Sequence, residues 1–163
     1  MPVAKILLYP DPTLRMICAS ANAQKDETRK VIQNLCDTLD AGYGVGIAAP
    51  QIGAMLRIII VDATRAKRPT ANHGRLVLLN PQIVVSEGDI SFREGCMSLP
   101  DLVGQVPRAE KVTIAARDVN GEPLVLSTEG YEAVILQHEI DHLDGVLFID
   151  RVRRARDIKP RSK

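Results

Sequence analysis

The chain has 163 residues, a formal net charge of +1 and a hydrophobic fraction of 45%. This size fits one domain with a real core, which must be mainly aliphatic because aromatic residues make up only 3%. The near-neutral charge argues against a dedicated nucleic-acid binder, and the lack of any apolar run of about 18 residues argues against a membrane span.

The first half of the chain predicts a helix followed by a buried strand. Residues 10–15 contain two prolines, which favour an extended or turn segment. Residues 25–41 have apolar side chains at helical spacing and predict an amphipathic helix, which the glycines of residues 42–46 end. Residues 57–62 form a short apolar run that predicts a buried strand, and the polar residues 63–74 predict a surface loop.

The second half predicts strands and one further helix. Residues 76–85 are apolar enough for a strand, with a bend at Pro81. Residues 111–117 and 122–127 alternate around Asn120-Gly121, which predicts a hairpin. Residues 130–144 have apolar spacing typical of a helix. Antiparallel strands with a helix at each end of the sequence indicate an α+β fold.

The run His138-Glu-Ile-Asp-His142 at the end of the second predicted helix points to a metal site. Residues four apart share one face of a helix, so both imidazoles can bind one ion. Glu139 lies beside the first of them, close enough to handle the proton of an attacking water. The ordinary alternative to a metal site is that the two histidines are four apart by chance on a solvated helix. On an apolar helix, however, such polar groups need a hydrogen-bond partner or a bound ion.

A catalytic site of this type needs a third protein ligand, and spacing alone leaves it open. No His or Glu follows residue 142. Cys96 is a candidate because it stands in a polar segment between Gly95 and Pro100, although a lone cysteine is commonly a small buried apolar residue. We expect Cys18 and Cys36 to be such small buried apolar residues.

Residues 44–53, Gly-Val-Gly-Ile-Ala-Ala-Pro-Gln-Ile-Gly, form a third unusual segment. The pattern lacks the third glycine of a dinucleotide site and the Lys-Ser/Thr of a P-loop, so we do not expect a nucleotide. Small residues here would let another backbone approach closely.

Three motifs together resemble the peptide deformylase family: Gly44 to Gln51, Glu94 to Ser98 and Gln137 to His142. The resemblance covers nearly the whole chain. It implies a single compact α+β domain over residues 1–163, with mainly antiparallel sheets around a central metal-bearing helix. Two departures are a methionine at residue 97, where the family usually has leucine, and a C-terminus shorter than in members that end in a long helix.

The resemblance also implies an activity, the removal of the N-formyl group from the formyl-methionine of new proteins, and roles for particular residues. Cys96, His138 and His142 would hold the metal, and Glu139 would be the general acid/base. The Gln51 amide and the Met97 backbone N–H would face the formyl oxygen. The expected substrate-binding residues are Gly44, Val45, Gly46, Phe92, Gly95, Val134 and Ile135, with His138 also a wall of the methionine pocket. For Val134 and Ile135, core packing is the ordinary alternative.

One divalent metal is expected, and two arguments about its identity disagree. Two imidazoles and one thiolate suit Zn²⁺ on general grounds. The resemblance implies Fe²⁺ in the cell, with Zn²⁺, Ni²⁺ or Co²⁺ able to occupy the site, and we follow the resemblance.

Three other functions stay open from the sequence. A zinc peptidase that cuts internal bonds would explain the two histidines but not Cys96 or Gln51. A structural metal module would need a fourth ligand, for which Cys18, Cys36 and His73 are the spare candidates. A family member could also have drifted to another preferred substrate.

Location and partners follow from the remaining features. The N-terminus lacks a signal-peptide pattern and the three cysteines do not suggest disulfides, so we expect a cytoplasmic monomer without membrane contact. The tail, residues 151–163, holds seven basic residues and one acidic residue. A solvated, frayed end is one interpretation; a weak, salt-dependent contact with ribosomal RNA, near emerging formylated chains, is the other.

Overall fold

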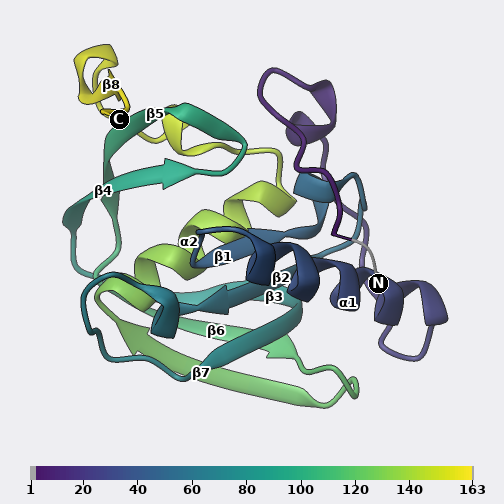
Figure 1. Cartoon of the computed structure of the whole chain (residues 1–163). Helices are drawn as coiled ribbons and strands as arrows, with labels where there is room; N and C mark the ends of the chain where they lie inside the picture. The colour runs from purple at the N-terminus through teal and green to yellow at the C-terminus, as the bar shows by residue number, and fades with distance from the viewer. Residues whose placement is uncertain (1–2, 163) are drawn as a thin grey trace.

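Two antiparallel sheets enclose one central helix (Figure 1). The structure is a computed structural model and describes residues 3–162, so the expected domain limits at residues 1 and 163 lie outside it. One sheet has five strands in the order β1-β2-β3-β6-β7, and the other has three in the order β4-β5-β8. The strands are Gly46–Ala48 (β1), Ile58–Asp62 (β2), Arg75–Glu87 (β3), Ile90–Cys96 (β4), Leu99–Arg108 (β5), Lys111–Arg117 (β6), Pro123–Glu129 (β7) and Ile158–Pro160 (β8). This confirms the expected α+β fold.

Helix α1 spans Asp26–Ala41 and matches the helix predicted from the apolar spacing. Acidic residues begin it, where the helix dipole favours negative charge, and Gly42 caps its end. Val31, Leu35 and Leu39 are buried and pack in a core cluster with strand β2.

Strand β2 is buried on both faces, as its continuous apolar run predicts. Ile58 and Ile60 belong to the core cluster on the α1 side, whereas Ile59 and Val61 belong to the cluster that packs against the second helix. The alternation of side chains along one strand therefore divides the core into two layers.

The predicted bend and hairpin both occur in the five-stranded sheet. The pairing of β3 with β6 shifts register between Leu79 and Gln82, which flank Pro81. Strands β6 and β7 pair in continuous register from Lys111 opposite Glu129 to Arg117 opposite Pro123. Their turn contains Gly121 at a φ of 83°, a left-handed conformation that favours glycine.

Helix α2, Tyr131–Leu143, lies between the two sheets and is the central element of Figure 1. Every residue from Glu132 to Leu143 is buried. A helix that is buried all round normally carries apolar side chains on every face, yet this one carries Glu139, Asp141 and two histidines. These polar groups must therefore find partners within the protein.

Several elements go beyond the sequence prediction. The strands β1, β4, β5 and β8 were not predicted, and Pro12–Arg15 forms one turn of 3-10 helix within the segment predicted as extended or turn. Short 3-10 turns also occupy Ala49–Ile52, Ala63–Arg65, Phe148–Asp150 and Ala155–Asp157. No helix in residues 3–162 has the length and apolar character needed to cross a membrane.

The chain leaves α2 through Gly145, where two backbones come unusually close. Gly145 has a φ of 73°, and a Cβ placed on it would overlap the carbonyl of Arg15. We predict that Gly145→Ala destabilises the protein by about 3 kcal/mol, because it combines left-handed strain with a backbone clash. Urea unfolding of the purified variant measures this change.

Gly74→Ala is the matched control. Gly74 has a similar φ of 71°, but no atom of residues 3–162 lies within 4 Å of the added Cβ. Its cost is therefore the conformational strain alone, about 1–2 kcal/mol. Equal losses in the two variants would show that the approach of Arg15 is unimportant.

Candidate metal centre and active site

Three buried side chains from two elements converge at one place. The ligand atoms of Cys96, His138 and His142 all lie within 4.8 Å of one another. His138 and His142 are one helical turn apart on α2, and their rings stand 5.1 Å apart between centroids. The Cys96 Sγ is 3.4 Å from His142 Nε2. The structure thus brings together the three residues expected to hold the metal.

Strand β4 positions Cys96 by ending there. The strand turns back into β5 within two residues, with Cys96 opposite Leu99. Side chains alternate along β4, so Glu94 and Cys96 are both buried while Gly95 is exposed. The register of β4 with β5 shifts between Glu94 and Cys96, which leaves the Gly95 backbone at an irregular point of the strand.

Glu94 orients the first histidine. Its carboxylate lies 2.8 Å from His138 Nδ1, which leaves Nε2 for the cluster. Arg108 donates two hydrogen bonds of 2.7 and 2.8 Å to the same carboxylate. Burial alone would raise the pKa of Glu94, but Arg108 and His138 hold it below its usual value. A carboxylate behind a ligating histidine fixes the ring and strengthens it as a ligand.

The ionic contacts continue through the interior beyond Glu94. Arg108 also donates to Asp141 at 2.7 Å, and Asp141 accepts from Arg151 at 2.9 Å. We call His138, Glu94, Arg108, Asp141 and Arg151 the buried ion chain; its outer end, Arg151, is exposed at the surface. It connects β4, β5, α2 and the segment after α2, and it gives His138 and Asp141 of the buried helix their partners.

The two histidines differ in electrostatic environment. Burial lowers the pKa of His142 well below its usual value, so the ring is neutral, which is the form that binds metals. Burial also opposes protonation of His138, but Cys96 and Glu94 outweigh it and raise the pKa. The cluster therefore stabilises positive charge at this point. A divalent cation fits such a donor set of one thiol and two imidazoles.

Glu139 lies in the same buried space. Its side chain is 4% exposed, and its Oε1 has no hydrogen-bond partner among the described residues. Burial raises the pKa of this carboxyl to about 7. The other oxygen, Oε2, lies close to the backbone of Gly46, where an added Cβ would stand 2.9 Å away. Glu139 therefore has a free oxygen, and glycine at residue 46 leaves it room.

Gln51 presents its amide nitrogen to the cluster. The side-chain carbonyl accepts a hydrogen bond of 3.0 Å from the backbone of Ala48. This contact fixes the amide so that Nε2 points towards Cys96 Sγ at 3.6 Å and Ser98 Oγ at 3.1 Å. Gln51 is 1% exposed, so the donor is held in a water-poor site.

The glycine segment and the end of β4 meet beside these groups. An added Cβ on Gly44 would come within 3.2 Å of the Met97 side chain. β1 and β4 are both terminal strands of their sheets, so each has one edge without a neighbouring strand in the described part of the chain. Two open strand edges therefore flank the cluster, one at Gly46 and one at Gly95.

The expected pocket walls occupy different surroundings. Ile135 is buried, and its side chain would stand 3.0 Å from a Cβ added at Gly46. Val45 packs against the core cluster that contains Ile135. Val134 is also buried, at 1% exposure. Phe92 stacks on Tyr131 at 4.9 Å between ring centroids, at the first turn of α2 rather than the turn that carries the histidines.

The spare metal-ligand candidates lie elsewhere. Cys18 is buried beside the end of α2, and burial raises its pKa to about 11. Cys36 is half-buried on α1, and His73 pairs with the buried Glu132. Within residues 3–162 none of them joins the metal cluster, so a closed four-ligand structural site is not formed.

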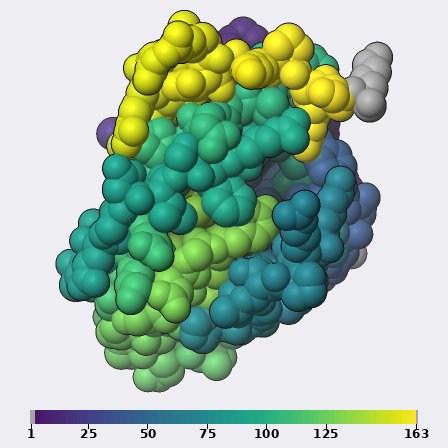
Figure 2. Space-filling view, turned by 90° about the vertical axis from the view of Figure 1, so that its left-hand side faces the viewer, coloured from purple at the N-terminus to yellow at the C-terminus, as the bar shows by residue number. Residues whose placement is uncertain are grey.

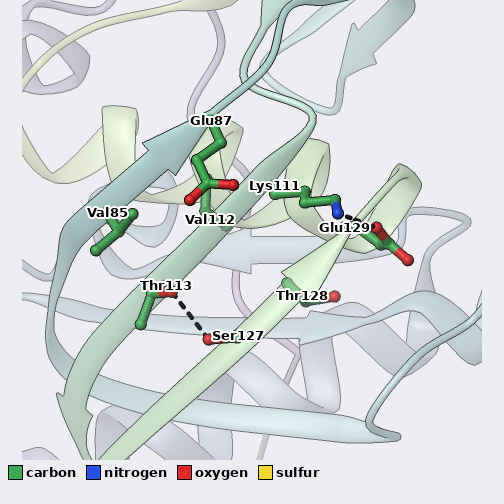
Figure 3. A pocket seen from close by; sticks show the side chains of 8 residues that line it. All are labelled: Val85, Glu87, Lys111, Val112, Thr113, Ser127, Thr128 and Glu129. Atoms are coloured by element: carbon green, nitrogen blue, oxygen red, sulfur yellow. Dashed lines mark hydrogen bonds and ion pairs between the residues drawn. The ribbon is translucent and has the colours of Figure 1, made fainter.

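A surface hollow of about 320 Å³ lies on the five-stranded sheet and contains none of these residues (Figure 3). Its walls come from β3, β6 and β7, with a hydrogen bond of 2.9 Å between Thr113 and Ser127. Lys111 pairs with Glu129 at 3.5 Å along its side. It offers no cluster of buried reactive groups, so the candidate site is the centre at Cys96.

Sequence reasoning missed the contributions of five residues to the site: Glu94, Ser98, Arg108, Asp141 and Arg151. Ser98 and Asp141 lie inside motifs whose other residues were given roles, so their positions in those motifs could have indicated that they belong to the site. Arg108 lies in the stretch 106–112 that the family resemblance covers, but it was given no role, because only the fold brings it to Glu94.

Comparisons with known proteins agree with this geometry. The sequence model of the family described as polypeptide deformylase matches residues 3–157. A peptide deformylase from Syntrophobacter fumaroxidans is 40% identical over 99% of this chain and 94% of its own length. One from Desulfotalea psychrophila is 38% identical over 93% of this chain and 89% of its own length. A crystal structure of a peptide deformylase from Legionella pneumophila has a TM-score of 0.84 at 41% identity, covering 93% of this chain and 86% of that one. A crystal structure of a Met-Ala-Ser-bound peptide deformylase from Acinetobacter baumannii has a TM-score of 0.85 at 32% identity, covering 93% of this chain and 99% of that one.

The buried ion chain generates a stability prediction. Arg108→Met removes one cation and leaves the carboxylates of Glu94 and Asp141 buried without it, which should cost about 3–5 kcal/mol of unfolding free energy. Arg153→Met is the control, because Arg153 pairs with Asp89 on the exposed surface. Urea denaturation compares the two variants. A similar, small loss in both would contradict a structural role for the buried ion chain.

Proposed function

The chain belongs to the peptide deformylase family, and we propose that Cys96, His138 and His142 hold its metal while Glu139 moves the proton of the reaction. Like its relatives, the protein is a metal-dependent hydrolase. It removes the N-formyl group from the formyl-methionine of new proteins and releases formate. The observation that carries the proposal is the buried convergence of one thiol and two imidazoles beside a carboxyl with a free oxygen.

The reaction needs a water activated near neutral pH and a polarised formyl group. A bound divalent metal supplies both, because it acts as a Lewis acid. Glu139 accepts the proton of the attacking water as the new C–O bond forms. It then passes this proton to the peptide nitrogen as the C–N bond breaks, which leaves formate and a free amino terminus. The raised pKa of Glu139 supports both steps, since the group can hold or release a proton near pH 7.

Charge develops on the formyl oxygen during attack, and two donors are proposed to stabilise it. The Gln51 amide is already aimed into the site by Ala48 and Ser98. The backbone N–H of Met97 is the second donor, and the substitution of methionine for leucine leaves that group unchanged. A single donor of this kind is typically worth about 3 kcal/mol.

The substrate is proposed to lie as a strand between the open edges of β1 and β4. Main-chain hydrogen bonds from such edges bind an extended peptide without regard to its side chains. Gly44, Gly46 and Gly95 let that backbone approach closely. The methionine side chain would then occupy a pocket formed by Val45, Phe92, Val134, Ile135 and His138. The Met-Ala-Ser peptide bound to the Acinetobacter relative supports a peptide site of this kind.

We propose Fe²⁺ as the metal in the cell, with Zn²⁺, Ni²⁺ or Co²⁺ able to replace it. A site with one thiolate and two imidazoles accepts several divalent ions, so availability and oxygen exposure decide which one is bound. We further propose that the protein is a cytoplasmic monomer.

The basic tail is proposed to make a weak contact with the ribosome. Arg151 and Arg153 are held in ion pairs with Asp141 and Asp89. Arg154 and Arg156 are exposed, and no ion pair within residues 3–162 engages them, so their charge is available for RNA phosphates. Residue 163 of this tail lies outside the described part of the chain.

The catalytic assignment is tested by Glu139→Gln. The variant should keep its metal, because the carboxyl is not a ligand, while kcat falls by about 10²–10⁴ because the amide cannot accept a proton. Metal content by elemental analysis and deformylation of a formyl-Met peptide, with anaerobically prepared protein, measure both quantities. Cys96→Ser should instead lose metal, and Cys36→Ser should retain it. A Glu139→Gln enzyme with most of its kcat would rule out the proposed proton carrier.

The ribosome contact is tested by the double substitution Arg154→Gln and Arg156→Gln. Truncation at residue 153 is unsuitable because it would also remove β8. The variant should co-sediment less with ribosomes at low salt, and the difference should vanish at high salt. Co-sedimentation equal to that of the parent chain would show that these arginines are only solvated.

A further inference from the structure

The end of the chain returns to Gly95, the residue before Cys96. Strand β8 pairs antiparallel with β5, from Gly104 opposite Ile158 to Leu102 opposite Pro160. One further hydrogen bond of 2.8 Å joins the Arg161 N–H to the carbonyl of Asp101. In Figure 2 the yellow tail runs along the teal strands β4 and β5 and reaches the rim of the hollow beside them. The tail is therefore a docked part of the three-stranded sheet and not a frayed end.

The side chain of Arg161 lies between the two walls of the proposed peptide path. Its guanidinium stands 5.8 Å from the ring centroid of Tyr43, in the segment that leads into Gly44 and β1. On the other side it lies over Gly95, where an added Cβ would meet guanidinium atoms at 3.4 to 3.6 Å. A guanidinium over an aromatic face is attracted by the ring, so Tyr43 holds the charge in place.

The charge of Arg161 has no counter-ion among residues 3–162. Within the described residues no carboxylate forms an ion pair with Arg161, whereas Arg108, Arg151 and Arg153 each have one. Both Arg161 and Gly95 are exposed, so a bound peptide can reach the guanidinium. A cation that is held in position and lacks a counter-ion is prepared to bind an anion.

We propose that Arg161 binds a carboxylate side chain of the formylated peptide, at a residue that follows the methionine. The inference rests on the proposed path of the peptide between β1 and β4. The formyl group and methionine occupy the buried centre, so the chain beyond them must leave through the exposed rim. The rim at Gly95 carries the guanidinium, whose planar pair of donors matches a carboxylate in geometry and charge. Arg161 thus adds a preference for acidic sequences to a site that otherwise binds main chain.

Isosteric peptide pairs test this preference. The substrates are C-terminally amidated formyl-Met-Ala-Ala-Ala peptides with either Glu or Gln at the second, third or fourth residue. We expect a kcat/KM ratio of Glu to Gln of roughly three- to fivefold at one of these residues, the size usual for an exposed ion pair. The effect should lie in KM, and 0.5 M salt should reduce it because salt screens exposed charges.

Variants assign the ratio to Arg161. Arg161→Gln should bring it to about one, and Arg117→Gln, at the exposed β6–β7 hairpin, should leave it as in the parent enzyme. Tyr43→Phe keeps the ring and should keep the ratio, whereas Tyr43→Ala should lower it. A ratio near one in the parent enzyme, or an unchanged ratio in Arg161→Gln, would overturn the proposal. An equal rise in kcat/KM for all peptides in Arg161→Gln would also overturn it, because Arg161 would then obstruct the peptide path and not bind a carboxylate.

The ratio is taken on one enzyme with two substrates, which separates two kinds of failure. If the parent enzyme deformylates neither peptide, the function proposed for the site is wrong. If it deformylates both without preference, only the role of Arg161 is wrong.

Discussion

The pairing of Glu94 with Arg108 is the contact on which the site depends. Both side chains are buried, and removing either one would deprive the other of its bidentate partner, which is strongly destabilising in the interior. Cys96 reaches the site from one sheet, and the histidines reach it from the helix that the sheet covers. Their separation is therefore set by how β4 and β5 sit on α2. Arg108 fixes this placement, because it bonds Glu94 on β4 and Asp141 on α2 at the same time.

The sequence predicted the parts of the molecule that are specified locally. The apolar spacing of residues 25–41 predicted α1, and the apolar run of residues 57–62 predicted β2 as a buried strand. The hairpin at Asn120-Gly121 followed from turn chemistry. The histidines at spacing four came together because one helix carries both. The position of Cys96 beside them needed a family resemblance, since no local rule joins a strand end to a distant helix.

The second sheet was missed for a physical reason. Strand β4 alternates correctly, but one of its inward positions holds Glu94, so the apolar pattern that indicates a half-buried strand is interrupted. Strand β5 contains prolines and ends in the buried Arg108. Strand β8 has three residues within a basic tail, and it forms because β5 offers a free edge. In each case the strand is specified by a partner distant in sequence.

The burial of α2 from Glu132 to Leu143 has an evolutionary consequence. A substitution almost anywhere on that helix disturbs packing or a charge pair, so the chemistry is held on a scaffold that tolerates little change. Tyr43 and Arg161 lie instead in a loop and at the chain end, where replacement costs little stability. Catalysis and peptide selectivity are thus carried by separate parts of the chain. Substitutions at Tyr43 and Arg161 can therefore change peptide selectivity during evolution, while selection preserves the catalytic residues on α2.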